Sequence, residues 1–250
     1  MPELSLPVFA GLTLVAFVGG FVSSIAGAGG MLVLPCLLWA GIPPVLALGT
    51  NKTQSVFGTL SSAINFSRKG HLDLKPLRGT LVWAFFGAIG GTWLVQSMDK
   101  AVLETLLPAI LIVLSIYFAV SPRVSDLDHP PRLSGRSFAP VVGGGLGLYG
   151  GFFGPGMGSF AAAAFAGLRG YNMRRATAST KPVVLVTNFT SMVMFIAGGH
   201  VIWSLVAAMA VAQVVGARLG SNMVIHRGAA LVKPVIVVVT AAIAVRLMLR

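Results

Sequence analysis

Cysteine and charge are scarce in this sequence of 250 residues. The single cysteine, Cys36, excludes an intrachain disulfide and any metal cluster built from several cysteines. Only 10% of the residues are charged, whereas 56% are hydrophobic and the mean hydropathy is +0.88. This composition excludes a soluble domain and predicts a membrane protein, because apolar runs of about 20 residues cross the hydrocarbon of a bilayer.

Acidic residues are scarcer still, with six Asp and Glu against 18 Lys and Arg, for a net charge of +12. All six fall in expected loops or at expected helix ends: Glu3, Asp73, Asp99, Glu104, Asp126 and Asp128. With no carboxylate at membrane depth to bind sodium or relay a proton, a cation transporter is disfavoured. No catalytic set of polar residues is expected at that depth either. We therefore predict no enzyme activity, catalytic residue, metal or cofactor.

The basic residues cluster in short stretches between apolar runs. Residues 68–78 hold Arg68, Lys69, Lys75 and Arg78, and residues 169–175 hold three arginines. Such clusters are typical of the cytoplasmic loops of membrane proteins, and they disfavour nucleic-acid binding as the reason for the positive charge. We expect a multi-pass protein embedded in lipid, with no nucleic-acid partner.

Apolar runs fill most of the chain, and no linker divides it, so residues 1–250 are expected to form one transmembrane domain. Two runs, residues 31–40 and 159–168, are too short to cross a membrane, and each directly follows a glycine cluster. Each is therefore either the returning arm of a re-entrant hairpin or the second half of a broken crossing helix.

The two halves of the sequence repeat each other weakly. An offset of 129 positions pairs Lys52 with Lys181 and His71 with His200, and internal symmetry is typical of transporter folds. The aligned loops differ in charge, because residues 68–78 are basic while residues 198–200 hold no Lys or Arg. This difference predicts repeats of inverted topology, which needs an odd number of crossings in each half.

The predicted fold is an all-α polytopic membrane protein with two inverted-topology repeats. Each repeat has a glycine-broken re-entrant helical hairpin followed by three transmembrane helices. The repeats span residues 1–120 and 138–250, and residues 121–137 form a cytoplasmic connecting loop. This arrangement puts both termini outside and leaves Lys100 as the outer loop cation, although Arg246 and Arg250 at the outer end count against it. Full crossing by the broken helices remains the alternative, and it splits the Lys and Arg residues almost evenly between the two sides of the membrane.

Interface anchors are predicted near the expected helix ends. Trp39, Trp93 and Trp203 fit an aromatic belt, and Arg218 fits a basic anchor. His71 and His200 fit solvated or capping positions better than a proton relay.

Two glycine clusters are the first candidates for a binding site: Gly27, Gly29 and Gly30, and Gly154, Gly156 and Gly158. A half-helix that starts at mid-membrane points unpaired amides and the positive end of its dipole at the centre, where an anion binds favourably. Glycine lets the backbone approach such a ligand closely. Close packing of helices is the alternative role, and it is favoured for isolated glycines.

Two lysines inside apolar helices are the second candidates. Lys52 and Lys181 each lie about two turns into a predicted helix, and Asn51, Thr180 and Asn188 are polar neighbours. Two lysines would supply positive charge, while hydroxyls and amides replace the hydration of an anion. Snorkelling of the lysines to an interface and hydrogen bonds between helices are the alternatives. We predict that both halves face each other and form one central site for a small anion.

These motifs resemble the TauE/SafE family of sulfite exporters, also called the toluenesulfonate uptake permease (TSUP) family. The resemblance rests on an apolar helix entering the cluster at residues 27–30, on Gly49 to Lys52, and on residues 154–158 with Thr180 and Lys181. It covers nearly the whole chain and implies transport of sulfite, sulfoacetate or related anions across a bacterial plasma (inner) membrane. Thr180 stands where the first half has Asn51, so the two lysine sites are not equivalent in this pattern.

The expected function is export of a small sulfur-containing anion by alternating access through the central site. An inside-negative potential favours anion exit by about 2.3 kcal/mol per charge per 100 mV, so no coupling ion is required. The alternative is an uptake permease or passive channel for organic or inorganic anions on the same scaffold. The sequence leaves open the substrate, the direction, proton coupling and a homodimeric state.

Overall fold

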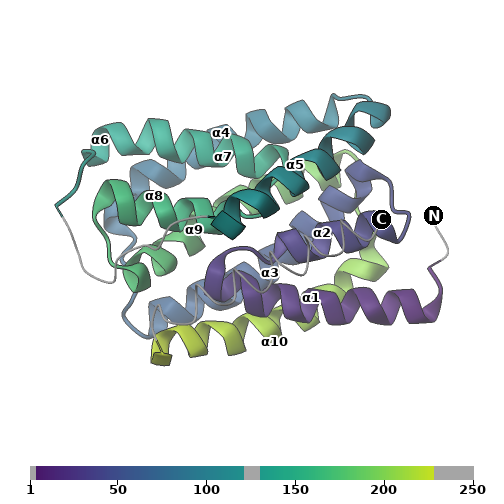
Figure 1. Ribbon diagram of the computed structural model, residues 1–250, viewed down its shortest axis with the longest axis horizontal. Coiled ribbons are helices and arrows are strands. Elements are labelled where there is room, and N and C mark those ends of the chain that lie inside the picture. Colours follow the sequence, from purple (N-terminus) through teal and green to yellow (C-terminus); the bar gives the residue numbers. More distant parts are fainter. Residues whose placement is uncertain (1–3, 121–129, 228–250) are drawn as a thin grey trace.

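The computed structural model describes residues 4–120 and 130–227, and every regular element in these ranges is helical (Figure 1). The first half contains α1 (Leu6–Ala26), α2 (Gly30–Trp39), α3 (Pro44–Arg68), the 3-10 turn η1 (Lys75–Leu77), α4 (Arg78–Gln96) and α5 (Lys100–Val120). The second half contains α6 (Gly135–Phe138), the π-helical turn η2 (Ala139–Gly143), α7 (Gly144–Phe152), α8 (Met157–Arg169), α9 (Met173–Ala197) and α10 (Trp203–Arg227). The predicted last helix, residues 231–249, lies outside the described residues.

The helices suit a membrane. Three of the described helices are long and apolar enough to cross one, Leu6–Ala26, Met173–Ala197 and Trp203–Ile225, and Gly30–Trp39 is a shorter apolar helix. Large apolar side chains also face outward, among them Phe86 and Trp93 on α4 and Val211 on α10. Soluble monomers rarely expose so much apolar surface. The fold is therefore that of an all-helical protein consistent with several membrane passes.

Glycine, proline and asparagine set the helix ends that position the site. Gly27 ends α1 in the left-handed conformation at φ 72°, where a side chain would be strained. Pro44 occupies the first turn of α3, a position that needs no backbone donor. The side chain of Asn172 caps α9 by accepting a hydrogen bond from the Arg175 backbone N–H at 2.9 Å.

In the first half, α1 and α2 form a helical hairpin. Figure 1 shows α2 running back beside α1 toward the end of the molecule where the chain begins. Gly19, before the break, lies against Val33 and Gly29, which follow it. A helix that merely kinked and continued would separate these residues.

In the second half, α8 returns along α6 and α7 in the same way. The rings of Tyr149 in α7 and Phe160 in α8 are in edge contact with centroids 5.4 Å apart. The Leu133 backbone N–H, just before α6, donates to the carbonyl of Leu168 near the end of α8 at 3.0 Å. In both halves, the short helix that follows the glycine cluster runs back along the helix that precedes it.

The long helices pack around these hairpins through small residues. α3 and α9 contact each other, while α1 packs on α10 and α4 packs on α7. In the α4–α7 contact, Gly147 and Gly151 lie directly against the backbone of Ala84 and Ala88. Small residues allow such close approach of helices in membranes.

Two helix boundaries differ from the sequence-based expectation. The apolar run 202–217 predicted a helix end near Arg218, but α10 continues to Arg227, so Arg218 lies inside the helix and is exposed. The prediction relied on the apolar run, and the residues after 217 are more polar, so the sequence did not reveal that the helix continues. The apolar run before the second glycine cluster spans residues 140–153 and predicts a helix start at residue 140. The helix begins earlier, at Gly135, because Ser134 caps it by accepting from the Ser137 N–H.

Candidate functional site

Both predicted lysines are buried side chains at the same position of equally long helices. Lys52 in α3 and Lys181 in α9 are exposed by only 1% and 3%, and each helix has 25 residues. Within residues 4–120 and 130–227, the one ion pair joins Lys100 and Glu104 on the surface. Neither buried lysine therefore has a carboxylate partner in the described structure, an unfavourable state for an intramembrane cation unless other groups compensate.

Each lysine binds the end of a broken helix in the opposite half of the chain. The Lys181 Nζ donates to the Ser23 carbonyl in the last turn of α1 at 3.0 Å. The Lys52 Nζ donates to the Gly150 carbonyl in the last turn of α7. Carbonyls at a helix C-terminus carry partial negative charge and lack partners within the helix, so they stabilise a cation.

The two glycine clusters meet at the breaks. Gly27 and Gly158 are in backbone contact, so that a Cβ on either would overlap the other. Gly30 faces Pro155 of the second cluster, and a Cβ on Gly30 would lie 3.2 Å from the Pro155 Cα. The Ser159 hydroxyl also donates to the Ala26 carbonyl, which ties the start of α8 to the end of α1. The tips of both hairpins therefore lie side by side.

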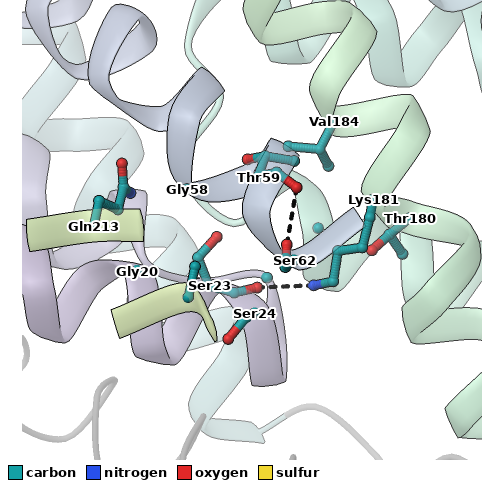
Figure 2. A pocket seen from close by; sticks show the side chains of 13 residues that line it. Gly20, Ser23, Ser24, Gly58, Thr59, Ser62, Thr180, Lys181, Val184 and Gln213 are labelled. Carbon is teal, nitrogen blue, oxygen red and sulfur yellow. Dashed lines mark hydrogen bonds between the residues drawn. The ribbon is translucent and has the colours of Figure 1, made fainter. Parts of the chain in front are cut away.

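A small polar cavity lies beside this contact (Figure 2). Its volume is about 20 Å³, which is room for about one water molecule. Its polar side chains come from α1, α3, α9 and α10, and they include Ser23, Ser24, Thr59, Ser62, Thr180, Lys181 and Gln213. An oxyanion larger than water enters only if these walls move.

Gln213 is a lining residue that the sequence did not reveal. It is exposed by 3%, and its side-chain oxygen has no hydrogen-bond partner among the described residues. Gly20 and Gly58 lie against it, so α1, α3 and α10 converge at this side chain. Its position in an apolar stretch of the sequence signals a buried polar group, but only the fold places it near Lys181.

The predicted site residues divide into three groups. Gly27, Gly158, Thr180 and Lys181 line the cavity. Lys52 and Gly154 form a second group away from the cavity, where Gly154, at φ 96°, lies against the Lys52 ammonium group. The remaining predicted residues do not line this cavity: Gly29, Gly30, Asn51, Gly156 and Asn188.

Three of these outlying residues have evident structural roles. Gly29 packs against Gly19 of its own hairpin. Gly156 caps α8 at φ 78°. The Asn51 side chain accepts a hydrogen bond from the Gln54 amide at 3.0 Å. The first-half cluster thus combines the two roles considered for glycine, close packing at Gly29 and cavity lining at Gly27.

The two histidines lie in connections between helices. The His200 Nδ1 is 3.3 Å from the Gln96 side-chain oxygen. His71 lies between α3 and η1, where burial and then the nearby Arg174 lower its pKa below the ordinary 6.5. In the described ranges, no three His, Cys, Asp or Glu side chains gather to hold a metal ion. The chemistry of the site rests on cationic, hydroxyl and amide groups.

Several known proteins are similar to this chain over nearly its whole length. The family model described as "Sulfite exporter TauE/SafE" matches residues 12–247. A "Probable membrane transporter protein YfcA" of Escherichia coli K12 is 40% identical over 237 residues, covering 95% of this chain and 88% of the relative. A "Probable membrane transporter protein" of Haemophilus influenzae is 37% identical over 238 residues, covering 95% and 93%. No solved structure matches.

Proposed function

The chain belongs to the sulfite exporter TauE/SafE family and is a membrane transporter, and we propose that it exports a small sulfur-containing oxyanion such as sulfite or sulfoacetate. The anion binds at the junction of the two hairpins, in the cavity beside Lys181, and crosses by alternating access. The membrane is the bacterial plasma membrane, which the protein crosses several times.

The observation that carries this proposal is the state of Lys181. Its side chain is almost fully buried, with an exposure of 3%, and lines a polar cavity. Its hydrogen-bond acceptor is a neutral carbonyl. A buried cation without an anionic partner attracts an anion, because opposite charges attract each other strongly where little water screens them. Thr180 and Ser62 offer further polar groups at the same cavity.

Binding and movement are linked in this proposal. An oxyanion that binds Lys181 competes with the Ser23 carbonyl and thereby releases α9 from the end of α1. Since the cavity holds about one water in this state, the anion must also push the hairpin tips and α9 apart. Substrate binding therefore favours the rearrangement that transport requires.

Inverted repeats would supply the two states of alternating access. The pairing of α1 with α10 is mirrored by that of α7 with α4, and the two lysines cross between the halves in the same way. These reciprocal contacts support two equivalent units, residues 1–120 and 138–250, with re-entrant hairpins that meet at the membrane centre. Repeats of inverted topology exchange conformations to open a site to either side.

Sulfite flux in proteoliposomes tests the proposal. Wild-type protein should give saturable sulfite efflux that increases when the inside is made negative. Lys181→Gln should lower this flux at least tenfold, the loss expected for one charge-assisted contact of about 1.4 kcal/mol or more. Lys69→Gln is the matched control, because Lys69 is an exposed lysine of the α3–α4 connection. Flux that rises linearly with concentration would favour a passive channel, and unchanged flux in Lys181→Gln would leave the lysine only a structural role.

A further inference from the structure

A second cavity opens at the start of α9, next to the connection between α3 and α4. Its volume is about 360 Å³, so it is much larger than the cavity beside Lys181. The side chains that matter for its chemistry are His71, Asp73, Tyr171, Arg174, Arg175 and Ser179. We call this cavity the vestibule.

The vestibule presents guanidinium groups that are free to bind an anion. Arg174 and Arg175 are exposed, and neither forms an ion pair in the described part of the chain. The Arg175 guanidinium lies over the Tyr171 ring, 3.9 Å from its centroid, which orients it. Among the described lining residues the one carboxylate is Asp73, which accepts a hydrogen bond from the Lys75 backbone N–H at 2.9 Å and so caps its own turn.

Ser179 links the vestibule along α9 to the cavity beside Lys181. Ser179 lines the vestibule and is exposed by only 4%. The next two residues, Thr180 and Lys181, line the inner cavity.

The equivalent place in the first half is closed. Thr50 stands 129 positions before Ser179, the offset that also relates the two lysines. Its hydroxyl accepts a hydrogen bond from the Ile202 backbone N–H at 3.1 Å, and Gly49 packs against the His200 carbonyl. The vestibule is therefore a feature of one end of the molecule, the end that carries the basic loops.

We infer that the vestibule is a separate oxyanion-binding site, which captures the substrate with Arg174 and Arg175 and delivers it past Ser179 to the Lys181 cavity. The inference rests on the proposed function for the delivery step. A guanidinium group offers paired N–H donors that match the oxygens of a sulfite, sulfonate or carboxylate group. A basic cleft with low-dielectric walls also raises the local concentration of an anion and its rate of entry.

Kinetics from the two sides of the membrane test the inference. The probe is sulfite, in phosphatidylcholine vesicles that hold no anionic headgroup to compete. The double variant Arg174→Gln/Arg175→Gln should raise the KM for sulfite about tenfold or more when sulfite enters from the basic end, with kcat unchanged, and it should weaken the salt dependence. Entry from the opposite side should keep its KM. Arg136→Gln is the control, because Arg136 is exposed near the same end and does not line the vestibule.

The outcomes separate this inference from the proposed function. Wild-type transport with a KM that the double variant leaves unchanged, or that Arg136→Gln raises equally, would overturn the vestibule site while leaving the transporter intact. If wild-type protein carried no sulfite, calorimetric titration of sulfite into purified protein would decide. Binding that survives Lys181→Gln and disappears in the double variant would support the vestibule, and no binding to wild type would overturn it.

Discussion

The buried residues of this protein form a reciprocal arrangement across the two halves of the chain. Lys181 of the second half binds α1 of the first, and Lys52 of the first half binds α7 of the second. The glycines at the breaks allow this exchange, because Gly27 and Gly158 touch without side chains between them. Each half thus completes the unsatisfied helix end of the other.

Gly158→Ala should separate the two hairpin tips. Gly158 lies within α8 and a Cβ there would overlap the Gly27 backbone, so we expect destabilisation of about 1–3 kcal/mol from overpacking and a loss of sulfite transport. Gly167→Ala in the same helix is the matched control. Nothing lies within 4 Å of its added Cβ, so alanine should stabilise by about 0.5–1 kcal/mol through its higher helix propensity. Thermal unfolding in detergent compares the two, and equal melting temperatures would contradict the proposed contact.

His71 should make stability depend on pH. Burial first and Arg174 second lower its pKa from 6.5 in the folded protein; Asp73, Tyr171 and Arg175 are the other ionisable groups around the vestibule. The unfolded chain takes up a proton near pH 6.5 before the folded protein does, so the stabilising effect of neutral His71 is present above pH 6.5 and is lost as the pH falls through the folded pKa.

The difference in melting temperature between wild type and His71→Gln, measured from pH 7.5 to 5, checks this prediction. We expect wild type to lose stability relative to the variant on acidification. Arg174→Gln should bring the titration of His71 closer to 6.5 and reduce the relative loss. A difference that stays flat over this pH range would show that His71 has an ordinary pKa.

At the scale of elements, the sequence located the helices better than their contacts. Apolar runs bounded by glycine and proline gave the starts and ends of α1, α2 and α3 to within a few residues, because these residues act locally on the backbone. The polar end of α10 was missed because no apolar periodicity marks that part of the helix. The sequence also placed both lysines and both glycine breaks at equivalent positions.

The partners of those lysines could not be predicted from sequence. Ser23, Gly150 and Gln213 are far from their contacts along the chain, and their roles depend on how α1, α7 and α10 pack. Glycine has several uses that look alike in a sequence. Gly29 packs inside a hairpin while Gly27 lines a cavity, and only tertiary packing separates the two.

The contact between α3 and the α9–α10 connection should act as the closed end of the pathway. Thr50→Val removes the acceptor for the Ile202 N–H, so we expect a loss of about 1 kcal/mol in stability. Ser179→Ala, the equivalent change in α9, should leave stability nearly unchanged because Ser179 lines the open vestibule. Thermal unfolding of both variants, compared with wild type, measures this difference in stability. Equal destabilisation by both would mean that the two ends of the pathway are alike.

The whole molecule is polarised along its long axis. Trp39, Trp93 and Trp203 are exposed by 61%, 64% and 57%, and they lie at the end of α2, near the end of α4 and at the start of α10. Figure 1 shows the connections from α4 to α5 and from α9 to α10 at this end of the molecule, on the right. The basic connections from α3 to α4 and from α8 to α9 lie at the other end, on the left. Aromatic residues prefer membrane interfaces, and basic loops prefer the cytoplasmic side.

This polarity predicts which loops face the cytoplasm. Single cysteines are introduced as Lys69→Cys, Arg136→Cys, Asp99→Cys and Ser204→Cys, all exposed positions, in a Cys36→Ser background. In intact cells, a membrane-impermeant maleimide should label the variants at 99 and 204, while those at 69 and 136 should react only after the membrane is opened. The proposed re-entrant hairpins require this result, because each would return to the side from which it entered and so add no crossing. If each glycine-broken helix instead crossed the membrane once, positions 99 and 204 would lie on opposite sides, and labelling of only one of them would rule out the inverted arrangement.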